Sequence, residues 1–426
     1  MPRCLCSHCS RPIEFAAEQA RQEAVCPYCK KTTRLEEETA PLARLPSNAP
    51  RSAFVKKVNL GSKASEAVAG EVPIPPPPTA TGRNTVRSLE PVISTAVTEE
   101  AAVRTGAVSS APVRLLAERI LQNMERVVIG KRDRLQLVLA AFFAEGHILL
   151  EDVPGVAKTM LARGLALSVG CDFKRIQCTP DLLPTDITGA SVFNPKTTEF
   201  EFRPGPLFAH LVLADELNRA TPRAQSALLE AMAERSVTVD GNHYDLERPF
   251  IIIATQNPID HEGTFPLPEA QLDRFLMRLS LGYPPFEEEM RILERFQHRH
   301  PIDSLTATAS IGEVLDAQQI VREVAIDPAV RDYLLRLVTA TRTHPSVALG
   351  ASPRASLALL RASQALAAIQ GYDFVLPDHI KELAPAVLDH RIIIHPEKRL
   401  RKVTSWMVVN ELLNTLPVPV MPGLPS

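Results

Sequence analysis

Residues 148–161, ILLEDVPGVAKTML, combine residue types that suit phosphate binding. Lys158 and Thr159 end the pattern G-x-x-x-x-G-K-[ST], in which backbone N–H groups wrap the phosphates, the lysine neutralises charge and the hydroxyl binds Mg²⁺. Both glycines of that pattern are absent, because Asp152 and Ala157 stand in their places. Gly155 remains, and it can adopt the positive φ that a loop around an anion needs. We therefore expect a phosphate-binding loop composed of Asp152, Val153, Pro154, Gly155, Val156, Ala157, Lys158, Thr159 and Met160.

The two replaced glycines set conditions on this loop. A carboxylate aimed at a phosphate would be repelled, so we expect Asp152 to face away from the anion. Ala157 directly precedes Lys158, and we expect it to have helical φ and ψ already, where a Cβ is tolerated.

Polar side chains at the ends of two later apolar runs could complete a site for phosphoryl transfer. HLVLADE (210–216) ends in Asp215 and Glu216, and FIIIATQNP (250–258) carries Asn257 near its end. Asp215 would hold Mg²⁺ together with Thr159. Glu216 would polarise the attacking water. The neutral amide of Asn257 could orient that water without competing for its proton.

The elements that must position these groups alternate along the chain. HILLE, HLVLAD and FIIIATQ are typical of buried strands, and KTMLARGLALSVG and PRAQSALLEAMAER have helical periodicity. This alternation predicts an α/β domain with a parallel sheet between helices over residues 113–284. After residue 284 helical patterns dominate, which predicts a smaller all-α domain over 285–420. The loop at 152–157 would then join a strand to a helix N-terminus, where backbone dipoles favour phosphate.

In this order the motifs resemble those of AAA+ ATPases, and specifically the MoxR family of the helix-2-insert clade. The strings that carry the resemblance are LLEDVPGVAKTML, LADELNRATPRAQSALLEAMAE, ATQNPIDHEGTFPLPEAQLDRFLM and GASPRA. The resemblance covers about residues 115–415, and aspartate and alanine in the loop look like variation common in that family. It implies a P-loop AAA+ core with an all-α lid that binds and hydrolyses ATP with Mg²⁺.

The resemblance also assigns roles to three arginines. Arg274 would be the arginine finger, acting in the site of a neighbouring subunit, with Arg278 as a weaker candidate; the alternative is that Arg274 is an ordinary interface arginine. Arg354, after Ser352 as a candidate N-cap, would be sensor 2, through which the lid touches the γ-phosphate. An arginine supplied by a neighbour implies a homo-oligomeric ring, a hexamer by family resemblance. The family's implied work is chaperone-like remodelling, maturation or cofactor insertion of client proteins, often with a von Willebrand factor A domain.

Two inserts could contact a client. Residues 189–208 resemble the helix-2 insert of this clade, and residues 235–249 predict a β-hairpin with a turn at Asp240–Gly241. Phe200, Phe202 and Tyr244 are the candidate contact aromatics, although packing inside the protein is the favoured alternative for each of them.

The first 35 residues predict a zinc-ribbon-like module. Cys6 with Cys9 and Cys26 with Cys29 form two C-x-x-C pairs, the spacing of a structural Cys₄ zinc site. The alternative is a set of unligated thiols. Residues 36–112 are rich in Pro, Ala and Ser and include VPIPPPPTATG, so we expect a disordered linker that tethers the module.

Composition excludes several other classes of protein. The formal net charge is −2, and the charges of the linker are balanced, which argues against nucleic acid as a partner. There is no apolar run long enough to span a membrane and no signal-peptide pattern, so a cytoplasmic location is expected. Cys171 and Cys178 are expected to be ordinary buried residues. Two rival functions stay open here: a nucleic-acid-directed AAA+ motor, and a nucleotide-gated scaffold that does not hydrolyse ATP.

Overall fold

The computed structural model describes residues 109–258, 263–296 and 301–419, and the backbone of four short strands near the N-terminus. The chain divides into two units, Met1–Thr95 and Ala96–Ser426. In the first unit β1 (Arg3–Leu5) pairs antiparallel with β2 (Pro12–Glu14), and β3 (Glu23–Val25) pairs antiparallel with β4 (Thr32–Arg34). The four cysteines of the expected zinc module and residues 36–108 of the expected linker lie outside the described residues.

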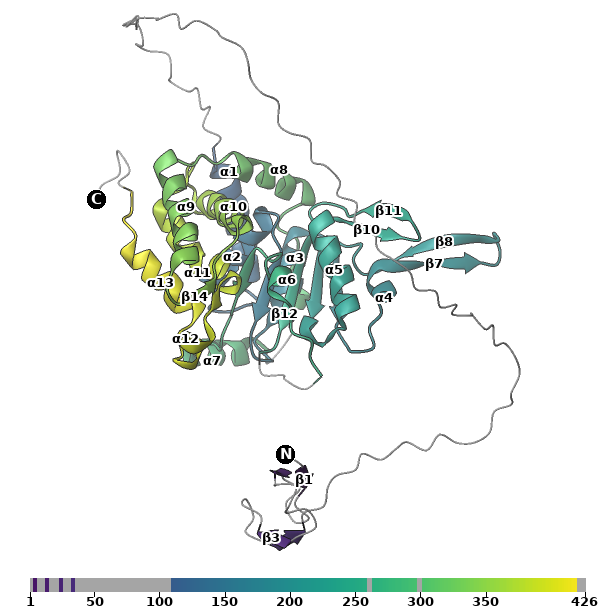
Figure 1. Cartoon of the computed structure of the whole chain (residues 1–426). Coiled ribbons are helices and arrows are strands. Elements are labelled where there is room, and N and C mark those ends of the chain that lie inside the picture. Colours follow the sequence, from purple (N-terminus) through teal and green to yellow (C-terminus); the bar gives the residue numbers. More distant parts are fainter. Residues whose placement is uncertain are drawn as a thin grey trace, which may run out of the picture. The chain divides into compact units, whose positions relative to one another are not determined.

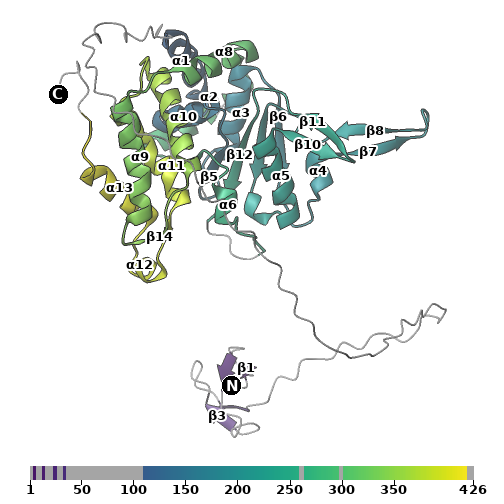
Figure 2. The same cartoon turned by 45° about the horizontal axis from the view of Figure 1, so that its top comes forward.

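A five-stranded parallel sheet forms the centre of the second unit (Figures 1 and 2), as the alternating pattern predicts. Its strand order is β13–β5–β12–β9–β6, which differs from the order along the chain and requires helical crossovers. The strands are β5 (Ile148–Glu151), β6 (Phe173–Gln177), β9 (Leu211–Asp215), β12 (Ile251–Gln256) and β13 (Met277–Leu279).

Helices cover both faces of this sheet because successive strand residues point to opposite sides. Leu213 and Ile253 pack in one buried cluster with α1, α2 and α3, whereas Val212 and Ile252 pack in a second cluster with α4 and α5. The helices are α1 (Ala111–Met124), α2 (Arg132–Phe143), α3 (Lys158–Val169), α4 (Pro184–Thr188) and α5 (Pro222–Glu234), with the short turns η2 (Leu217–Arg219) and α6 (Glu269–Leu272) before β13. Each fully buried Leu or Ile contributes about 1.5–3 kcal/mol of hydrophobic stabilisation.

The C-terminal part is helical, as expected, and shares the first cluster with α1 to α3. Two of its helices begin at clear polar caps: Ser310 and Glu313 form a capping box for α8, and Asp327 caps α9. Two short strands, β14 and β15, pair antiparallel within it. The elements are α7 (Phe286–Phe296), η3 (Pro301–Ser304), α8 (Ile311–Glu323), α9 (Pro328–Thr343), β14 (Val347–Leu349), α10 (Pro353–Gln370), α11 (Pro377–Leu388), η4 (Asp389–Arg391), β15 (Ile393–Ile394), α12 (Pro396–Leu400) and α13 (Ser405–Thr415).

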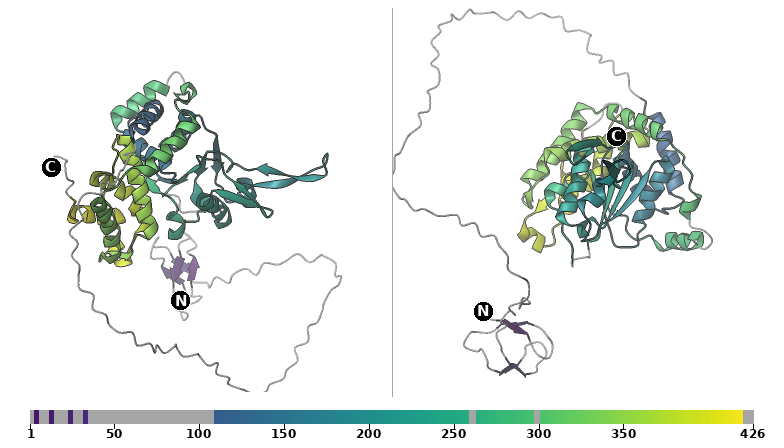
Figure 3. Two further views of the ribbon diagram at one scale, coloured as in Figure 1. Left: turned by 90° about the horizontal axis from the view of Figure 1, so that it is seen from above. Right: turned by 90° about the vertical axis from the view of Figure 1, so that its right-hand side faces the viewer.

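Two hairpins extend from the sheet edge near β6. β7 (Gly189–Asn194) pairs with β8 (Glu199–Pro204), and this hairpin projects away from the body (Figures 1 and 3). β10 (Ser236–Val239) pairs with β11 (Asn242–Asp245) through the predicted turn, in which Asp240 and Gly241 have φ of 52° and 80°. Positive φ at both central residues is the signature of the tight turn that matches strand twist.

The start of the folded body differs slightly from the expectation. Residues 111 and 112 were assigned to the linker, yet α1 begins at Ala111 and includes Pro112 in its first turn. Proline suits that position because its missing N–H has no helical partner there. Ser110, at the helix start, donates its backbone N–H to Asp373 Oδ1 at 2.6 Å and its hydroxyl to the same oxygen at 2.7 Å.

Candidate functional site

The loop between β5 and α3 has the shape of a phosphate-binding nest. Gly155 has φ of 87°, as expected, and Ala157 has φ of 60°. The expectation of helical geometry at Ala157 is therefore wrong: the residue is left-handed and forms the N-cap of α3. The reason is tertiary, since the chain must reverse there to present the N–H groups of the first turn of α3 to the cavity in front of it.

The carboxylate of Asp152 faces away from this nest, as expected. It accepts hydrogen bonds from the Ser280 hydroxyl at 2.8 Å, the Gly282 N–H at 3.1 Å and the Leu281 N–H. These residues follow β13, which pairs with β5. Asp152 is only 6 % exposed. The aspartate at the first glycine position therefore links the loop to the segment after the neighbouring strand, and its negative charge is not directed at an anion in the loop.

The predicted phosphate-site residues come together around one cavity of about 340 Å³. Pro154, Gly155, Ala157, Lys158, Thr159 and Met160 line it from the loop, and Asp215, Glu216 and Asn257 line it from the ends of β9 and β12. The Lys158 ammonium donates to the backbone carbonyl of Asp152 at 2.7 Å. The carboxyl ends of parallel strands meet at one sheet edge, which is why residues from three distant parts of the sequence converge here. Val153 and Val156 do not line this cavity.

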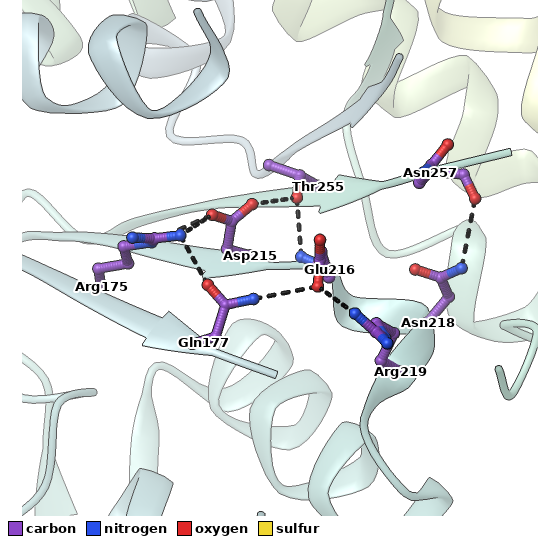
Figure 4. Close-up of polar contacts among 8 residues, drawn as sticks. All are labelled: Arg175, Gln177, Asp215, Glu216, Asn218, Arg219, Thr255 and Asn257. Atoms are coloured by element: carbon purple, nitrogen blue, oxygen red, sulfur yellow. Dashed lines mark hydrogen bonds and ion pairs between the residues drawn. The ribbon is translucent and has the colours of Figure 1, made fainter. Parts of the chain in front are cut away.

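The two acids of this cavity are held by partners that the sequence motifs do not reveal (Figure 4). Arg175 donates to Asp215 Oδ2 at 2.6 and 3.1 Å, while the Thr255 hydroxyl donates to Oδ1 at 2.6 Å. Glu216 Oε2 accepts from the Gln177 amide and from Arg219, both at 3.1 Å. Arg175 and Gln177 are themselves joined at 2.6 Å, so one chain of hydrogen bonds links both acids.

The sequence contains a signal for Arg175 and Gln177 as partners of the two acids. Residues two apart on a strand share one face, and β6 reads FKRIQ, with Arg175 and Gln177 at that spacing. Gln177 lies opposite Asp215 in the parallel register.

Asn257 lies at the end of β12 and is 7 % exposed. Its backbone carbonyl accepts from the Asn218 amide at 3.4 Å, which connects the chain after β12 to η2, next to Glu216 (Figure 4).

An apolar cavity of about 240 Å³ adjoins the other side of the loop. Val127, Val128, Ile129, Leu281, Pro284 and Ile292 contribute most of its apolar lining, and Gly155, Val156, Ala157 and Met160 line it from the loop. The residues outside the loop were not predicted. The only signal was the apolar run VVIG before α2, which by itself suggests packing.

The structure does not bring Arg274 and Arg354 to Lys158. Both arginines line a different cavity of about 270 Å³, together with Gly146 and His147. His147 immediately precedes β5, whereas the phosphate loop follows β5. The arginines and the loop therefore lie at opposite ends of the same strand, and neither arginine lines the cavity around Lys158 of its own chain.

The surroundings of these arginines differ. The Arg274 guanidinium donates to the Leu229 carbonyl, whereas Arg278 forms ion pairs with Glu151 at 3.0 Å and with Asp389. Arg278 is thus neutralised within its own chain. Ser352 precedes α10 as expected but makes no side-chain cap, because its hydroxyl donates to Asp273 at 3.1 Å.

Two histidines are buried and neutral: His147, which lines this arginine cavity, and His390, which precedes the lining residue Arg391. His147 Nδ1 accepts the Ile252 N–H at 3.0 Å, so its Nε2–H donates to the Met232 carbonyl at 3.1 Å. Burial lowers the pKa of His147 to about 4. His390 lies 3.1 Å from the Phe275 carbonyl through Nε2, and burial also lowers its pKa well below the ordinary value.

The remaining predictions have mixed outcomes. Cys178 is buried and Cys171 is half-buried, and burial raises the pKa of both thiols to about 12, which suits packing rather than nucleophilic chemistry. Packing within the protein holds for Phe202 and Tyr244, whose rings stack at 4.2 Å. It is wrong for Phe200, which is 74 % exposed because it lies in the projecting part of β8.

Metal and membrane features can be assessed only for the described part of the chain. There, no group of three or more His, Cys, Asp or Glu side chains is arranged to hold a metal ion. No helix among those residues has the length and apolar character needed to cross a bilayer.

The chain is similar to known ATPases in sequence and in fold. A family model described as "ATPase family associated with various cellular activities (AAA)" matches residues 147–277, and an AAA lid domain model matches residues 339–411. The chaperone MoxR1 of Mycobacterium tuberculosis is 40% identical over 72% of this chain and 84% of its own. Protein MoxR of Methylorubrum extorquens is 30% identical over 71% of this chain and 95% of its own, and protein YeaC of Bacillus subtilis is 51% identical over 72% and 95%. A solved structure of a candidate ATPase from Cytophaga hutchinsonii is 36% identical, with a TM-score of 0.69 over 73% of this chain and 97% of that one.

Proposed function

Since the chain belongs to the MoxR family of AAA-type ATPases, we propose that it binds ATP with Mg²⁺ and hydrolyses the terminal phosphoanhydride bond. The observation that carries this proposal is the cavity that joins the loop residues Lys158 and Thr159 to the acids Asp215 and Glu216. The neighbouring apolar cavity beside Ile129 suits the adenine ring, because it adjoins the same loop and has few polar groups.

The polar groups of the first cavity fit the parts of phosphoryl transfer. The N–H groups at the start of α3 and the Lys158 ammonium would hold the β- and γ-phosphates. Thr159 and Asp215 supply the hydroxyl and carboxylate oxygens that Mg²⁺ prefers, and the bound ion would neutralise charge on the phosphates. Glu216 takes the proton from the attacking water, and the Asn257 amide orients that water.

The site is incomplete within one subunit. Arg274 and Arg354 lie at the opposite end of β5 from the loop, so we propose that both reach the γ-phosphate of a neighbouring subunit's nucleotide. Arg274 is preferred to Arg278, because Arg278 is occupied by Glu151 and Asp389. Such a shared site requires a second copy of the chain, and a hexameric ring is the state that the family resemblance implies.

The energy of hydrolysis would remodel client proteins. One relative is named a chaperone, and von Willebrand factor A domains are the clients that the family resemblance suggests. The β7–β8 hairpin, taken as the helix-2 insert, exposes Phe193 and Phe200. Stacking of Phe202 on Tyr244 joins this hairpin to β10–β11, so that both would move together against a client. Phe200→Ser should remove stimulation of ATPase activity by a client and leave the basal rate unchanged.

The N-terminal residues would form a separate zinc module. Cys6 with Cys9 fall between β1 and β2 in the sequence, and Cys26 with Cys29 fall between β3 and β4. Two hairpins that each contribute two thiolates match a structural Cys₄ site. Elemental analysis of protein purified without chelator should give one zinc per chain, and no zinc would refute this assignment.

Hydrolysis is tested by comparing the wild type with Glu216→Gln. The variant should bind ATP with unchanged affinity and lose turnover, because an amide cannot accept the proton of the attacking water. Equal turnover would favour a nucleotide-gated scaffold over an ATPase. Strong stimulation by DNA, and none by any client protein, would favour a nucleic-acid-directed motor.

A further inference from the structure

Helix α7 carries an apolar stripe that is open to solvent. Phe286, Met290 and Leu293 follow one another at spacings of four and three residues, so they share one face of the helix. Phe286 is 78 % exposed and Leu293 is 64 % exposed. We call these three side chains the α7 stripe. Contiguous exposed apolar residues with polar neighbours are typical of a docking surface.

The helix that bears this stripe is acidic. Residues 286–296 contain four glutamates and two arginines. Glu287, Glu289 and Glu294 are exposed, and none of them is in an ion pair with another described residue. One of the two arginines, Arg295, donates to the carbonyl of Arg126, two residues after the end of α1, at 3.1 Å. A partner for the α7 stripe should therefore be apolar with a basic border.

The surface from α12 to the first turn of α13 has that character. Leu400 is 87 % exposed and Trp406 is 55 % exposed, and Met407 is exposed beside them in sequence. Residues 396–402 contain four basic residues and one glutamate, and the exposed bases of this segment are Arg399, Arg401 and Lys402. We call Leu400, Trp406, Met407 and these three bases the α12 patch. Trp and Arg are the residue types that most often anchor protein interfaces.

Helix α7, which carries the α7 stripe, and helix α12, which carries part of the α12 patch, lie at opposite edges of the 109–419 body. Figure 1 superposes α7 and α12, but both panels of Figure 3 show the green-teal α7 and the yellow α12 at opposite edges. A contact between unlike surfaces on opposite edges is head-to-tail, and repeated contacts of this kind generate rings when the rotation closes.

Each surface also adjoins one half of the divided site. Ile292 of α7 lines the apolar cavity beside the phosphate loop. Arg391 lines the cavity of Arg274 and Arg354, and α12 begins five residues later at Pro396. A contact of α7 with α12 of the next copy would therefore bring the nucleotide half of one subunit toward the arginine half of its neighbour.

We propose that the α7 stripe docks on the α12 patch of a second copy of this chain and forms part of the interface that closes the nucleotide site. This inference rests on the proposed function, because it supplies the contact that a site shared between subunits needs. The apolar side chains exclude water at the centre, and the glutamates of α7 pair with the bases of α12 at the rim.

Charge reversal with rescue tests the proposal. One variant carries Glu289→Lys and Glu294→Lys, a second carries Arg399→Glu and Lys402→Glu, and a third carries all four changes. Sedimentation velocity with Mg²⁺ and a non-hydrolysable ATP analogue measures the concentration of half-assembly. Each double variant should raise that concentration by about tenfold or more, because like charges then face each other, and the fourfold variant should return it to near the wild-type value.

Apolar substitutions give a second readout with a matched control. Leu293→Ser should weaken assembly, whereas Leu115→Ser should not, since Leu115 is 66 % exposed on α1 and belongs to neither surface. Both changes lie at exposed positions, so thermal unfolding should be unaffected.

Several outcomes would overturn the proposal. Either double variant could assemble at the same concentration as the wild type, or the fourfold variant could fail to recover assembly. The wild type could also stay monomeric with nucleotide. Fluorescent-nucleotide affinity of the wild type separates this failure from failure of the proposed function. If the wild type binds nucleotide tightly and the variants assemble normally, only the proposed interface is refuted. If the wild type does not bind nucleotide, the proposed function is refuted.

Discussion

Restoring glycine at the first position of the phosphate-loop pattern should damage this protein. Asp152→Gly removes the acceptor of three hydrogen bonds, from the Ser280 hydroxyl, the Leu281 N–H and the Gly282 N–H. Leu281 is buried, so water cannot replace the lost partner of its N–H. The substitution also adds backbone freedom at the end of β5 in the unfolded chain.

The expected cost follows from these contacts. Leaving one buried donor without a partner costs about 1–3 kcal/mol, and the half-buried Gly282 N–H adds a smaller cost. The sum is about 3 kcal/mol of unfolding free energy, which corresponds to a fall in Tm of roughly 5 °C for a folded body of this size. Ser280→Ala removes one of the three bonds and should cost about 1 kcal/mol.

Two assays measure the consequence. Differential scanning calorimetry should rank the loss of stability as Asp152→Gly above Ser280→Ala. Fluorescent-nucleotide titration should show weaker binding for Asp152→Gly, because the Asp152 carbonyl that accepts the Lys158 ammonium at 2.7 Å moves with the loop. If Asp152→Gly kept its Tm and bound ATP more tightly, the aspartate would be a defect in the loop and our account of it would fail.

Three further predictions concern the loop, a buried histidine and the arginines. Ala157→Gly relieves a left-handed alanine, so calorimetry should show a gain of about 0.5 kcal/mol, and a lower Tm would contradict the geometry of the nest. The folded pKa of His147 is about 4, below the ordinary 6.5, so its contribution to the free energy of unfolding is complete above pH 6.5. That contribution falls by up to about 3 kcal/mol as the pH drops toward 4, because the unfolded chain takes up a proton that the folded chain does not. Urea titrations of His147→Gln should show a flatter pH dependence of stability, and an unchanged pH dependence would refute this. Arg274→Ala should reduce kcat by about 10³-fold or more with only a small change in Tm, because it loses one hydrogen bond to the Leu229 carbonyl. Arg278→Ala should mainly lower Tm by breaking its ion pairs, and the reverse pattern in steady-state kinetics and calorimetry would exchange their roles.

The sheet and the convergence of polar residues around Lys158 were predictable because their signals are local. Apolar runs such as residues 211–214 and 251–254 are long enough to be buried strands, and the polar residues that follow each run must lie at the same edge of a parallel sheet. Asp215 and Asn257 therefore converge on Lys158 for reasons that the sequence alone contains. The turn at Asp240–Gly241 was predictable for the same reason, since the residue types determine the backbone geometry.

The features that escaped prediction depend on contacts between distant segments. Ala157 is left-handed because of the loop's tertiary shape, whereas its residue type favours a helix. Arg354 and Arg274 line one cavity, where the Ser352 hydroxyl at the start of α10 donates to Asp273, and no local pattern encodes that pairing. Phe202 and Tyr244 stack across two hairpins whose relative position the sequence does not give.

The central claim is that one subunit binds ATP while the next supplies the arginine. The most direct measurement is the ATPase activity of a mixture of Lys158→Ala and Arg274→Ala, each inactive alone. After dissociation and joint reassembly at equal concentrations, about a quarter of the interfaces combine an intact loop with an intact arginine, so the mixture should recover roughly a quarter of wild-type activity. A mixture as inactive as its components, in rings shown by mass to contain both variants, would contradict the account.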